Sequence, residues 1–365
     1  MDRAMKIAYD AKRMYYNHRG LGNYSRDVLR LMTTYAPENE YVLFAKPTDK
    51  YSFPDATTIA PKGIWKAMPS LWRSWGCVRS LEGADVYHGL SGEIPFGIKP
   101  PTKTVVTVHD AIFLRYPELY SPTYRRLFAH KVQYACDHAN KIIAISEQTK
   151  QDIIDFFHVD ESKIQVIYQG CNNIFRQQVP EAVLADVKRR YELPEAFILI
   201  VGAIEPRKNL ANLIRAVAAG RLDVPVFALG SPSKYAETCA QIARELDVEL
   251  RYLHNVPFAD FPAVYKAATV LAYPSLFEGF GIPILEAMCV GVPVVTSIGS
   301  CFAETGGDAA LYADPKEPED IAKQLQAVLS DSVLRQSMIS KGHLQAEKFT
   351  DEKVAHNLIR MYAEL

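Results

Sequence analysis

The chain has 365 residues, of which 48% are hydrophobic and 23% are charged. This length suits two domains of roughly 170 residues each, and the composition is that of a folded globular protein, which excludes disordered and fibrous classes. The net charge is −1, so no global field attracts a polyanion and a nucleic-acid partner is not expected.

The cysteine pattern and the hydropathy pattern both indicate a cytoplasmic protein. Six cysteines are dispersed along the chain without a Cys-x-x-Cys pair, which favours reduced thiols over a disulfide framework or a zinc site. Residues 1–10 contain no apolar signal region, and no run of eighteen uncharged apolar residues occurs. We therefore expect no spanning helix.

Short β-branched runs alternate with stretches of helical period, as βαβ units require. In the first half of the chain the predicted strands are 6–9, 41–44, 85–88, 104–109, 141–145 and 164–167. A polar stretch containing Pro180 and Pro194 follows. Unbroken apolar runs, typical of parallel strands covered on both faces, then occur at 197–201, 224–228, 270–273 and 293–296. The pattern predicts an α/β protein whose two domains divide near residues 175–180.

The clearest predicted helix begins at Ser121-Pro122, where a side-chain cap precedes a proline in the first turn. Helical spacing places five apolar side chains on one face, and the other face is basic. These are Tyr124, Leu127, Phe128, Val132 and Ala135.

The strongest chemical signal is a strand, a glycine-rich loop and a helix at 270–290. Pro283 suits the start of this helix, where a missing N–H costs nothing, and the free amides there can hold a phosphate or sugar hydroxyls. Glu278 in the loop and Glu286 one turn into the helix could accept hydrogen bonds from sugar and ribose hydroxyls. The structural alternative makes Glu278 a loop residue and Glu286 a favourable charge near a helix start.

A second motif, Glu205-Pro-Arg207-Lys208-Asn209-Leu210, also follows a buried strand. Asn209 is expected to cap the next helix. The adjacent cations Arg207 and Lys208 could neutralise a diphosphate, more strongly as it leaves. The alternative is a solvated basic pair.

Two weaker motifs lie in the first half of the chain. Gly20 and Gly22 form a loop that could let the backbone approach a phosphate, although Ser25 occupies the third glycine position of a dinucleotide fingerprint. His109 and Asp110 end an apolar strand, where side chains often meet substrate. A structural role for the histidine is the alternative.

In this order and spacing, the four motifs resemble those of the family-4 retaining glycosyltransferases, whose GT-B fold has two facing Rossmann-like domains with a donor cleft. The resemblance covers nearly the whole chain and is most specific at 205–210 and at 278–286, which matches the family's Glu-x7-Glu motif. It implies an acceptor domain at 1–175 and a nucleotide-sugar donor domain at 176–349. Residues 350–365 would cross back to the first domain.

The same resemblance assigns roles to individual residues. Arg207 and Lys208 would contact the donor diphosphate and Glu286 the ribose, while His109 would hydrogen-bond the transferred sugar. The implied catalytic residues are His109, Arg207, Lys208 and Glu278. The implied donor-binding residues are Gly20, Gly22, Asp110, Arg207, Lys208, Glu278, Phe280, Gly281, Ile282 and Glu286, with the backbone of Phe280, Gly281 and Ile282 and of Gly22 making the contacts.

The family is thought to retain the anomeric configuration, with the leaving phosphate helping to deprotonate the acceptor. No second carboxylate is placed as a nucleophile, and no Asp-x-Asp or His/Cys cluster is present. We therefore expect no metal or other cofactor.

Residues 108–126 look most like those of bacterial mannosyltransferases that build O-antigen and other surface polysaccharides. This favours GDP-mannose as donor and a glycan or polyprenyl-linked saccharide as acceptor. A UDP-sugar donor (glucose, galactose or GlcNAc), a sugar-nucleotide epimerase of the same architecture and a non-catalytic sugar-binding module are the alternatives. Oligomeric state is not readable from the sequence.

Residues 64–79 gather all three tryptophans with three basic side chains, a composition found at bilayer interfaces. This segment is either a peripheral contact with the cytoplasmic leaflet of a membrane or a packed surface element, since Pro69 and Gly76 interrupt any long helix.

Overall fold

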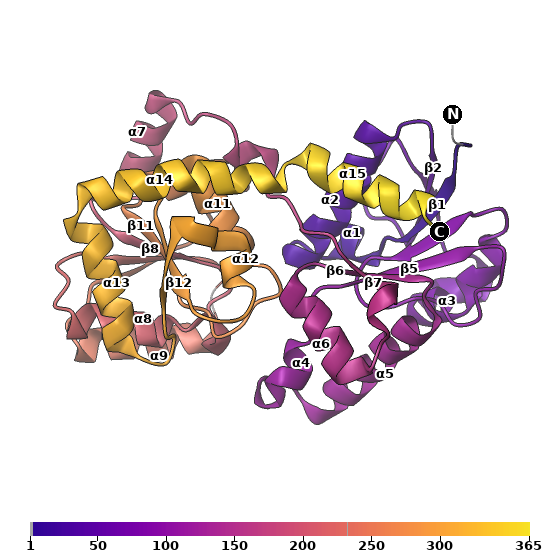
Figure 1. Cartoon of the computed structure of the whole chain (residues 1–365), viewed down its shortest axis with the longest axis horizontal. Coiled ribbons are helices and arrows are strands. Elements are labelled where there is room, and N and C mark those ends of the chain that lie inside the picture. Colours follow the sequence, from indigo (N-terminus) through magenta and orange to yellow (C-terminus); the bar gives the residue numbers. More distant parts are fainter. Residues whose placement is uncertain (1–2, 232) are drawn as a thin grey trace. The chain divides into compact units, whose positions relative to one another are not determined.

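The computed structural model describes residues 3–231 and 233–365. Two compact units are present, and each is built on its own parallel sheet (Figure 1). The first unit comprises the residues up to 169 together with residues 351–365, and the second unit spans 170–350. The junction precedes the predicted boundary at 175 because Phe175 packs edge-on against Tyr265, with ring centroids 5.4 Å apart, and so belongs to the second unit.

The sheet of the first unit has the strand order β3-β2-β1-β4-β5-β6-β7 with all neighbours parallel. The strands are β1 (Lys6–Asp10), β2 (Glu40–Phe44), β3 (Thr57–Ile59), β4 (Val86–Gly89), β5 (Lys103–Val108), β6 (Lys141–Ala144) and β7 (Ile164–Val166). The strand order reverses between β1 and β4, so the carboxyl ends of these two strands flank a topological switch point.

Helices cover both faces of this sheet (Figure 1). The helices are α1 (Lys12–Tyr16), α2 (Gly20–Tyr35), α3 (Pro69–Ser74), α4 (Ile112–Arg115), α5 (Pro122–His138), α6 (Glu147–Phe157) and α15 (Asp351–Ala363). The last helix packs on α2, where Arg30 Nη1 lies 2.8 Å from a carboxylate oxygen of Asp351. On the other face, α3, α5 and α6 contribute to a single apolar core with β4, β5 and β6.

A chain of buried polar side chains fixes α15 to the sheet. The Tyr362 hydroxyl lies 2.6 Å from His88 Nδ1, and His88 Nε2 lies 2.8 Å from Thr107 Oγ1. The Tyr24 hydroxyl lies 3.1 Å from the same Thr107 oxygen. Burial lowers the pKa of His88 to about 3, so its ring is neutral at physiological pH and can donate through one nitrogen while accepting through the other.

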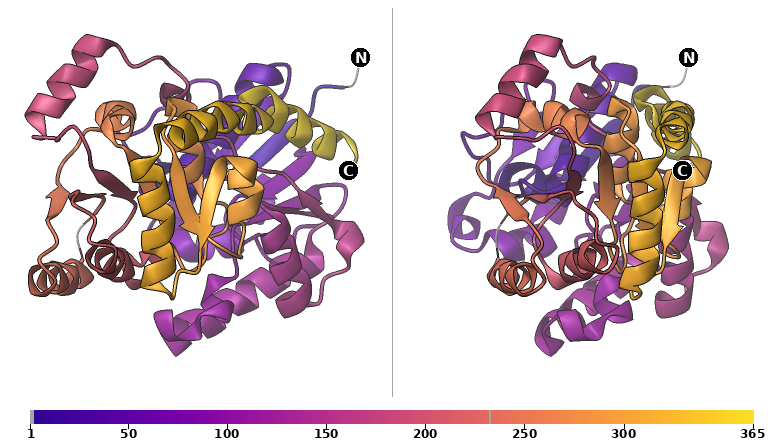
Figure 2. Two further views of the ribbon diagram at one scale, coloured as in Figure 1. Left: turned by 60° about the vertical axis from the view of Figure 1, so that its left-hand side comes forward. Right: turned by 90° about the vertical axis from the view of Figure 1, so that its left-hand side faces the viewer.

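The second unit has the strand order β10-β9-β8-β11-β12-β13, again parallel throughout. Its strands are β8 (Ile198–Val201), β9 (Val226–Leu229), β10 (Leu250–Leu253), β11 (Val270–Tyr273), β12 (Val294–Ser297) and β13 (Ala310–Ala313). Its helices, which lie on both faces of the sheet (Figure 2), are α7 (Glu181–Arg190), α8 (Leu210–Ala219), α9 (Lys234–Glu245), α10 (Phe261–Ala267), α11 (Ile282–Val290), α12 (Phe302–Gly306), α13 (Pro318–Ser330) and α14 (Ser332–Ala346). The order reverses between β8 and β11.

The predicted helix at Ser121 is present, and Ser121 Oγ accepts a hydrogen bond from the Tyr124 amide at 3.3 Å. The apolar face is not buried along its whole length, because Tyr124 and Leu127 are 46% and 58% exposed. Phe128 packs partly buried against the core of the first unit, and Val132 and Ala135 are buried in it.

Residues 64–79 form short helical segments. Trp72 is buried in the core of the first unit, whereas Trp75 is half-exposed and stacks on Phe96 at a centroid distance of 5.0 Å. Ile64 and Leu71 are also exposed. Across residues 3–231 and 233–365, no helix combines the length and the apolar character needed to cross a bilayer.

Candidate active site

The two strongest motifs meet at the switch point of the second sheet. A 3₁₀ turn, Pro206–Lys208, follows β8, and the loop 274–281 follows β11. Because β8 and β11 are parallel neighbours, both motifs lie at the same edge of the sheet. This is the edge at which open α/β sheets bind their ligands.

Glu278 joins the two predicted cations into one ion cluster. Its Oε1 atom lies 2.6 Å from Lys208 Nζ and 2.7 Å from Arg207 Nη1. Arg207 also donates to the carbonyl oxygen of Phe277 at 2.9 Å and to Glu205 Oε1 at 2.7 Å. Arg207 and Lys208 are therefore built into the fold of this edge, and the solvated basic pair is the wrong alternative.

The electrostatics of the cluster favour a charged Glu278. Burial opposes its ionisation, but the charges of Lys208 and Arg207 outweigh burial and lower the pKa of Glu278 to about 2. Burial lowers the pKa of Lys208, with the Glu278 charge opposing this. For Arg207 burial also acts to lower the pKa, but the Glu278 charge raises it overall.

Tyr273, the last residue of β11, was not predicted as a site residue. Lys208 Nζ donates to its hydroxyl at 2.7 Å and to Glu278, which leaves one of the three ammonium N–H groups for a ligand. Because Gly202 has no side chain, the aliphatic part of the Lys208 side chain can lie against the backbone at this position. A Cβ on residue 202 would come within 3.1 Å of Lys208 Cε. The position of Tyr273 at a strand end was the available signal.

Asn209 does not cap α8 through its side chain as predicted. Its backbone takes a left-handed conformation with φ of 62°, and its side-chain amide donates to the carbonyl oxygens of Pro274 and Pro315 at 3.0 and 2.6 Å. Asn209 thus ties the β8 motif to the loop after β11.

The start of α11 presents backbone amides at this edge. Gly281 precedes the helix with φ of 91°, a left-handed conformation that L side chains rarely adopt. The amides of Gly281 and Ile282 precede any acceptor within the helix. The Phe280 ring is buried against Phe349, so only its backbone can reach a ligand.

Glu286 lies one turn into α11 and accepts a hydrogen bond from the Tyr265 hydroxyl at 2.5 Å. Burial raises the pKa of Glu286 to about 7, although the Tyr265 hydrogen bond and the charge of Lys208 oppose this. Glu286 therefore titrates near neutral pH beside the ion cluster. Nothing in the sequence pattern pointed to Tyr265 as its partner.

In the first unit, His109 directly follows β5, as predicted. Its Nε2 atom lies 2.9 Å from the carbonyl oxygen of Leu90, which can only accept, so Nε2 carries the proton and Nδ1 keeps a lone pair. The Tyr24 ring packs edge-on against the imidazole at 4.6 Å. Burial lowers the pKa of His109 to about 4, so the ring is a neutral hydrogen-bond acceptor. Asp110 accepts from the Ile112 amide at 3.1 Å.

Gly20 and Gly22 do not form the predicted loop, because both lie in the first turn of α2. The Gly22 amide donates to the Arg19 carbonyl oxygen at 3.0 Å. A Cβ on Gly22 would lie 1.8 Å from the carbonyl oxygen of Asn17. Gly22 thus serves close backbone packing, and Gly20, with open space around it, is the residue whose backbone a ligand could approach.

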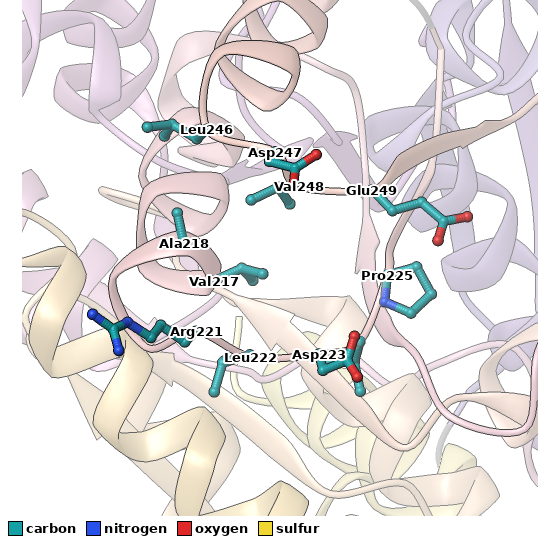
Figure 3. Close-up of a pocket in the computed structure, with 11 residues that line it drawn as sticks. Val217, Ala218, Arg221, Leu222, Asp223, Pro225, Leu246, Asp247, Val248 and Glu249 are labelled. Carbon is teal, nitrogen blue, oxygen red and sulfur yellow. The ribbon is translucent and has the colours of Figure 1, made fainter.

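A cavity of about 370 Å³ lies elsewhere in the second unit (Figure 3). Four charged side chains, Arg221, Asp223, Asp247 and Glu249, contribute to its lining. Its residues precede β9 and β10, so it lies at the amino ends of these strands. It is therefore distinct from the ion cluster at the carboxyl ends of β8 and β11.

Both units match known protein families. Residues 28–173 match "Glycosyltransferase Family 4" and residues 186–345 match "Glycosyl transferases group 1". The chain is 31% identical over 284 residues to the O-antigen chain mannosyltransferase B of Escherichia coli, covering 76% of this chain and 74% of that protein. It is 28% identical over 276 residues, 73% of its length, to the serotype-specific mannosyltransferase WbdA of Escherichia coli, of which it spans only 34%.

Solved structures share the fold. Anabaena Alr3699/HepE, in complex with UDP-glucose, matches with a TM-score of 0.78 at 18% identity, with 99% of this chain and 100% of that chain covered. The two parallel-sheet, Rossmann-like units are those of the GT-B fold. The family matches, the identity to a mannosyltransferase and this fold agree, and the chain belongs to the group 1 and family 4 glycosyltransferases.

Proposed function

We propose that this glycosyltransferase moves mannose from GDP-mannose onto a glycan or lipid-linked saccharide of a surface polysaccharide, with retention of anomeric configuration. The mannosyltransferase relatives, of which the O-antigen chain mannosyltransferase B is 31% identical, support mannose as the transferred sugar. The observation that carries the proposal is the ion cluster of Arg207, Lys208 and Glu278 at the carboxyl ends of β8 and β11.

The ion cluster suits a departing diphosphate. As the bond from the sugar C1 to the β-phosphate oxygen breaks, negative charge grows on that oxygen. The remaining ammonium N–H of Lys208 and the Arg207 guanidinium would stabilise this charge, since charge-assisted hydrogen bonds are among the strongest in proteins. The acceptor hydroxyl bonds to C1 on the same face and gives its proton to the leaving phosphate oxygen.

The remaining site residues would position the donor. The amides at the start of α11, from Gly281 and Ile282, would bind the β-phosphate together with the backbone of Phe280. Glu286, once ionised, would accept hydrogen bonds from the two ribose hydroxyls. Glu278, whose second oxygen is not used by the two cations, would accept a hydrogen bond from a sugar hydroxyl.

The proposal extends to the first unit. His109 would accept a hydrogen bond from a hydroxyl of the transferred sugar at Nδ1. The backbone of Gly20, rather than that of Gly22, would approach the diphosphate, with Asp110 fixing the turn after β5.

A UDP-sugar donor is the second candidate, because Alr3699/HepE, a protein of the same fold, was solved with UDP-glucose. Melting temperatures of the purified protein with GDP-mannose, UDP-glucose, UDP-galactose and UDP-GlcNAc separate the two. A ligand at about 100 times its Kd adds roughly 2.7 kcal/mol of stability. Stabilisation by GDP-mannose alone supports the proposal, and stabilisation by a UDP-sugar instead overturns the mannose assignment.

Turnover is tested with the nucleotide sugar that binds and a lipid-linked saccharide acceptor, with and without EDTA. The proposal expects nucleoside diphosphate release that depends on the acceptor and is unchanged by EDTA, and a product whose anomeric coupling in NMR matches that of the donor. Isomerised nucleotide sugar formed without acceptor would instead identify an epimerase.

A further inference from the structure

Cys171 and Cys289 lie side by side in the second unit, although 118 residues separate them in sequence. Their Sγ atoms are 3.3 Å apart. Cys171 is the second residue of this unit and is buried, while Cys289 lies near the carboxyl end of α11 and is partly exposed. Cys77 and Cys301 instead donate to backbone carbonyl oxygens.

The surroundings of the pair favour a reactive Cys289. The hydrogen bond from Cys171 lowers the pKa of Cys289, with burial opposing this and the nearby charge of Arg176 adding to it. The same hydrogen bond raises the pKa of Cys171. Arg176 donates to the carbonyl oxygens of Ala346 and Phe349 at 3.1 and 3.0 Å. Its Nη1 atom also lies 3.7 Å from Glu347 Oε1, and of these two nearby charges that of Arg176 favours a thiolate at Cys289 while that of Glu347 opposes it.

We propose that Cys289 and Cys171 form a thiol–disulfide switch on α11, with a peroxide as the oxidant. The Cys289 thiolate attacks hydrogen peroxide and gives a sulfenic acid and hydroxide. The Cys171 sulfur then attacks the sulfenic sulfur, loses its proton and releases water, so that two thiols and one peroxide become one disulfide and two waters. A dithiol reductant restores both thiols.

Closing the disulfide would draw Cys289, which lies on α11, toward Cys171. An S–S bond is about 2.05 Å long, so the two sulfurs must approach by about 1.3 Å. Cys289 lies one turn after Glu286, whose carboxylate contacts Tyr265. Because close-packed interiors transmit small shifts, any part of this approach that α11 takes up would displace both Glu286 and the amides at Gly281. We expect this displacement to lower the affinity of the oxidised protein for the donor, a consequence that rests on the proposed donor site.

The test begins with the full-length protein treated with hydrogen peroxide, alkylated and digested without reductant. The disulfide-linked Cys171–Cys289 peptide is expected as the main cross-linked product in mass spectrometry. The Kd for GDP-mannose, or for whichever nucleotide sugar the reduced protein binds, should rise threefold or more and return to its original value with dithiothreitol.

Two variants and one control make the test specific. Cys171→Ser and Cys289→Ser should lose the cross-link and the change in Kd, and Cys289→Ala serves where either serine variant is unstable. Cys239→Ala, at a buried cysteine of the same unit, should respond as the wild type does.

Absence of the cross-linked peptide would overturn the switch, as would a cross-link that leaves Kd unchanged or a response that persists without Cys289. If the reduced protein binds no nucleotide sugar, the proposed function fails. Peptide mapping and hydrogen exchange of 282–290 then still decide whether the disulfide forms and shifts α11.

Discussion

The Nζ atom of Lys208 lies 2.6 Å from Oε1 of Glu278, and that same oxygen also contacts Arg207. One carboxylate therefore holds two cations that belong to a different strand-to-loop junction. Glu278 thereby links the β8 and β11 motifs and orients the charges before any ligand arrives, which is the preorganisation that electrostatic stabilisation requires.

Replacement of this carboxylate should destabilise the second unit. Glu278→Gln leaves Arg207 and Lys208 buried without their shared anion, and breaking a buried ion pair costs about 3–5 kcal/mol. Because the pKa of Glu278 is lowered from 4.5 to about 2, its contribution is complete above pH 4.5 and is lost as the pH falls toward 2. Urea unfolding at pH 7 and pH 3 should show the difference between wild type and variant shrinking in acid. Glu237→Gln, at an exposed position, is the control, and equal stability of Glu278→Gln and wild type at pH 7 would contradict the ion cluster.

Loss of the Lys208 ammonium should mainly affect the chemical step. In the proposed mechanism, Lys208→Ala would remove one charged donor to the leaving diphosphate, which is commonly worth about 3 kcal/mol, or roughly a hundredfold in kcat. Steady-state kinetics with saturating acceptor measure this directly. The matched control is Lys341→Ala, which removes an exposed lysine of the same unit. Full activity of Lys208→Ala would rule out the diphosphate role.

Donor affinity should depend on pH through Glu286. Its pKa of about 7 means that the ligand-free carboxyl is mostly protonated at pH 6 and mostly ionised at pH 8. If only the carboxylate binds the ribose hydroxyls, affinity for the nucleotide should rise about tenfold between these values. Calorimetric titrations of wild type and Glu286→Gln check this, since the variant should bind weakly and with a flat profile. A wild-type Kd that does not change with pH would refute the ribose role.

His109 should act as a neutral acceptor. His109→Ala should lower kcat/KM about tenfold or more through loss of the proposed hydrogen bond to the sugar, while the affinity for free nucleotide stays unchanged. With a pKa of about 4, His109 should contribute no pH dependence between pH 5.5 and 8. Kinetics and nucleotide titration of the variant, with thermal melting to verify its fold, measure this. An equal loss of nucleotide affinity would argue against a contact limited to the sugar.

Membrane contact through residues 64–79 is a separate prediction. Ile64 and Trp75 are 71% and 52% exposed, and exposed apolar side chains beside basic ones bind anionic lipid surfaces. The protein should float with phosphatidylglycerol vesicles, and Ile64→Asp and Trp75→Asp should reduce the bound fraction severalfold. Val333→Asp changes a side chain of similar exposure in the second unit and should have no effect. Binding that survives both substitutions would favour the packed surface element.

Most of the strands could be predicted because parallel strands buried on both faces read as continuous apolar runs. The three that were missed, β3, β10 and β13, are edge strands, each with a neighbouring strand on one side only. Their exposed side chains break the apolar run, as in β10, where Leu250, Arg251 and Tyr252 are not buried.

The candidate site could be predicted where its residues directly follow a strand. Arg207, Lys208 and Glu278 follow strands and could be found, whereas Tyr265 comes from the middle of a helix and reaches Glu286 only through packing. The loop predicted at Gly22 is absent, because a glycine can allow close packing, here against Asn17, as readily as it allows a ligand to approach. Such contacts depend on how the chain packs in three dimensions, which no local sequence pattern records.

The position of α15 after the second unit in the chain has a consequence for synthesis on the ribosome. Tyr362 is the partner of His88 Nδ1, so the buried polar chain of the first unit stays open until translation has passed through the whole of the second unit. A fragment ending at residue 169 would expose the face of α2 that α15 covers and would leave His88 without that hydrogen bond. The first unit can thus reach its final stability only after residues 351–365 have been synthesised, and fragments intended to isolate it need these residues supplied in cis or in trans.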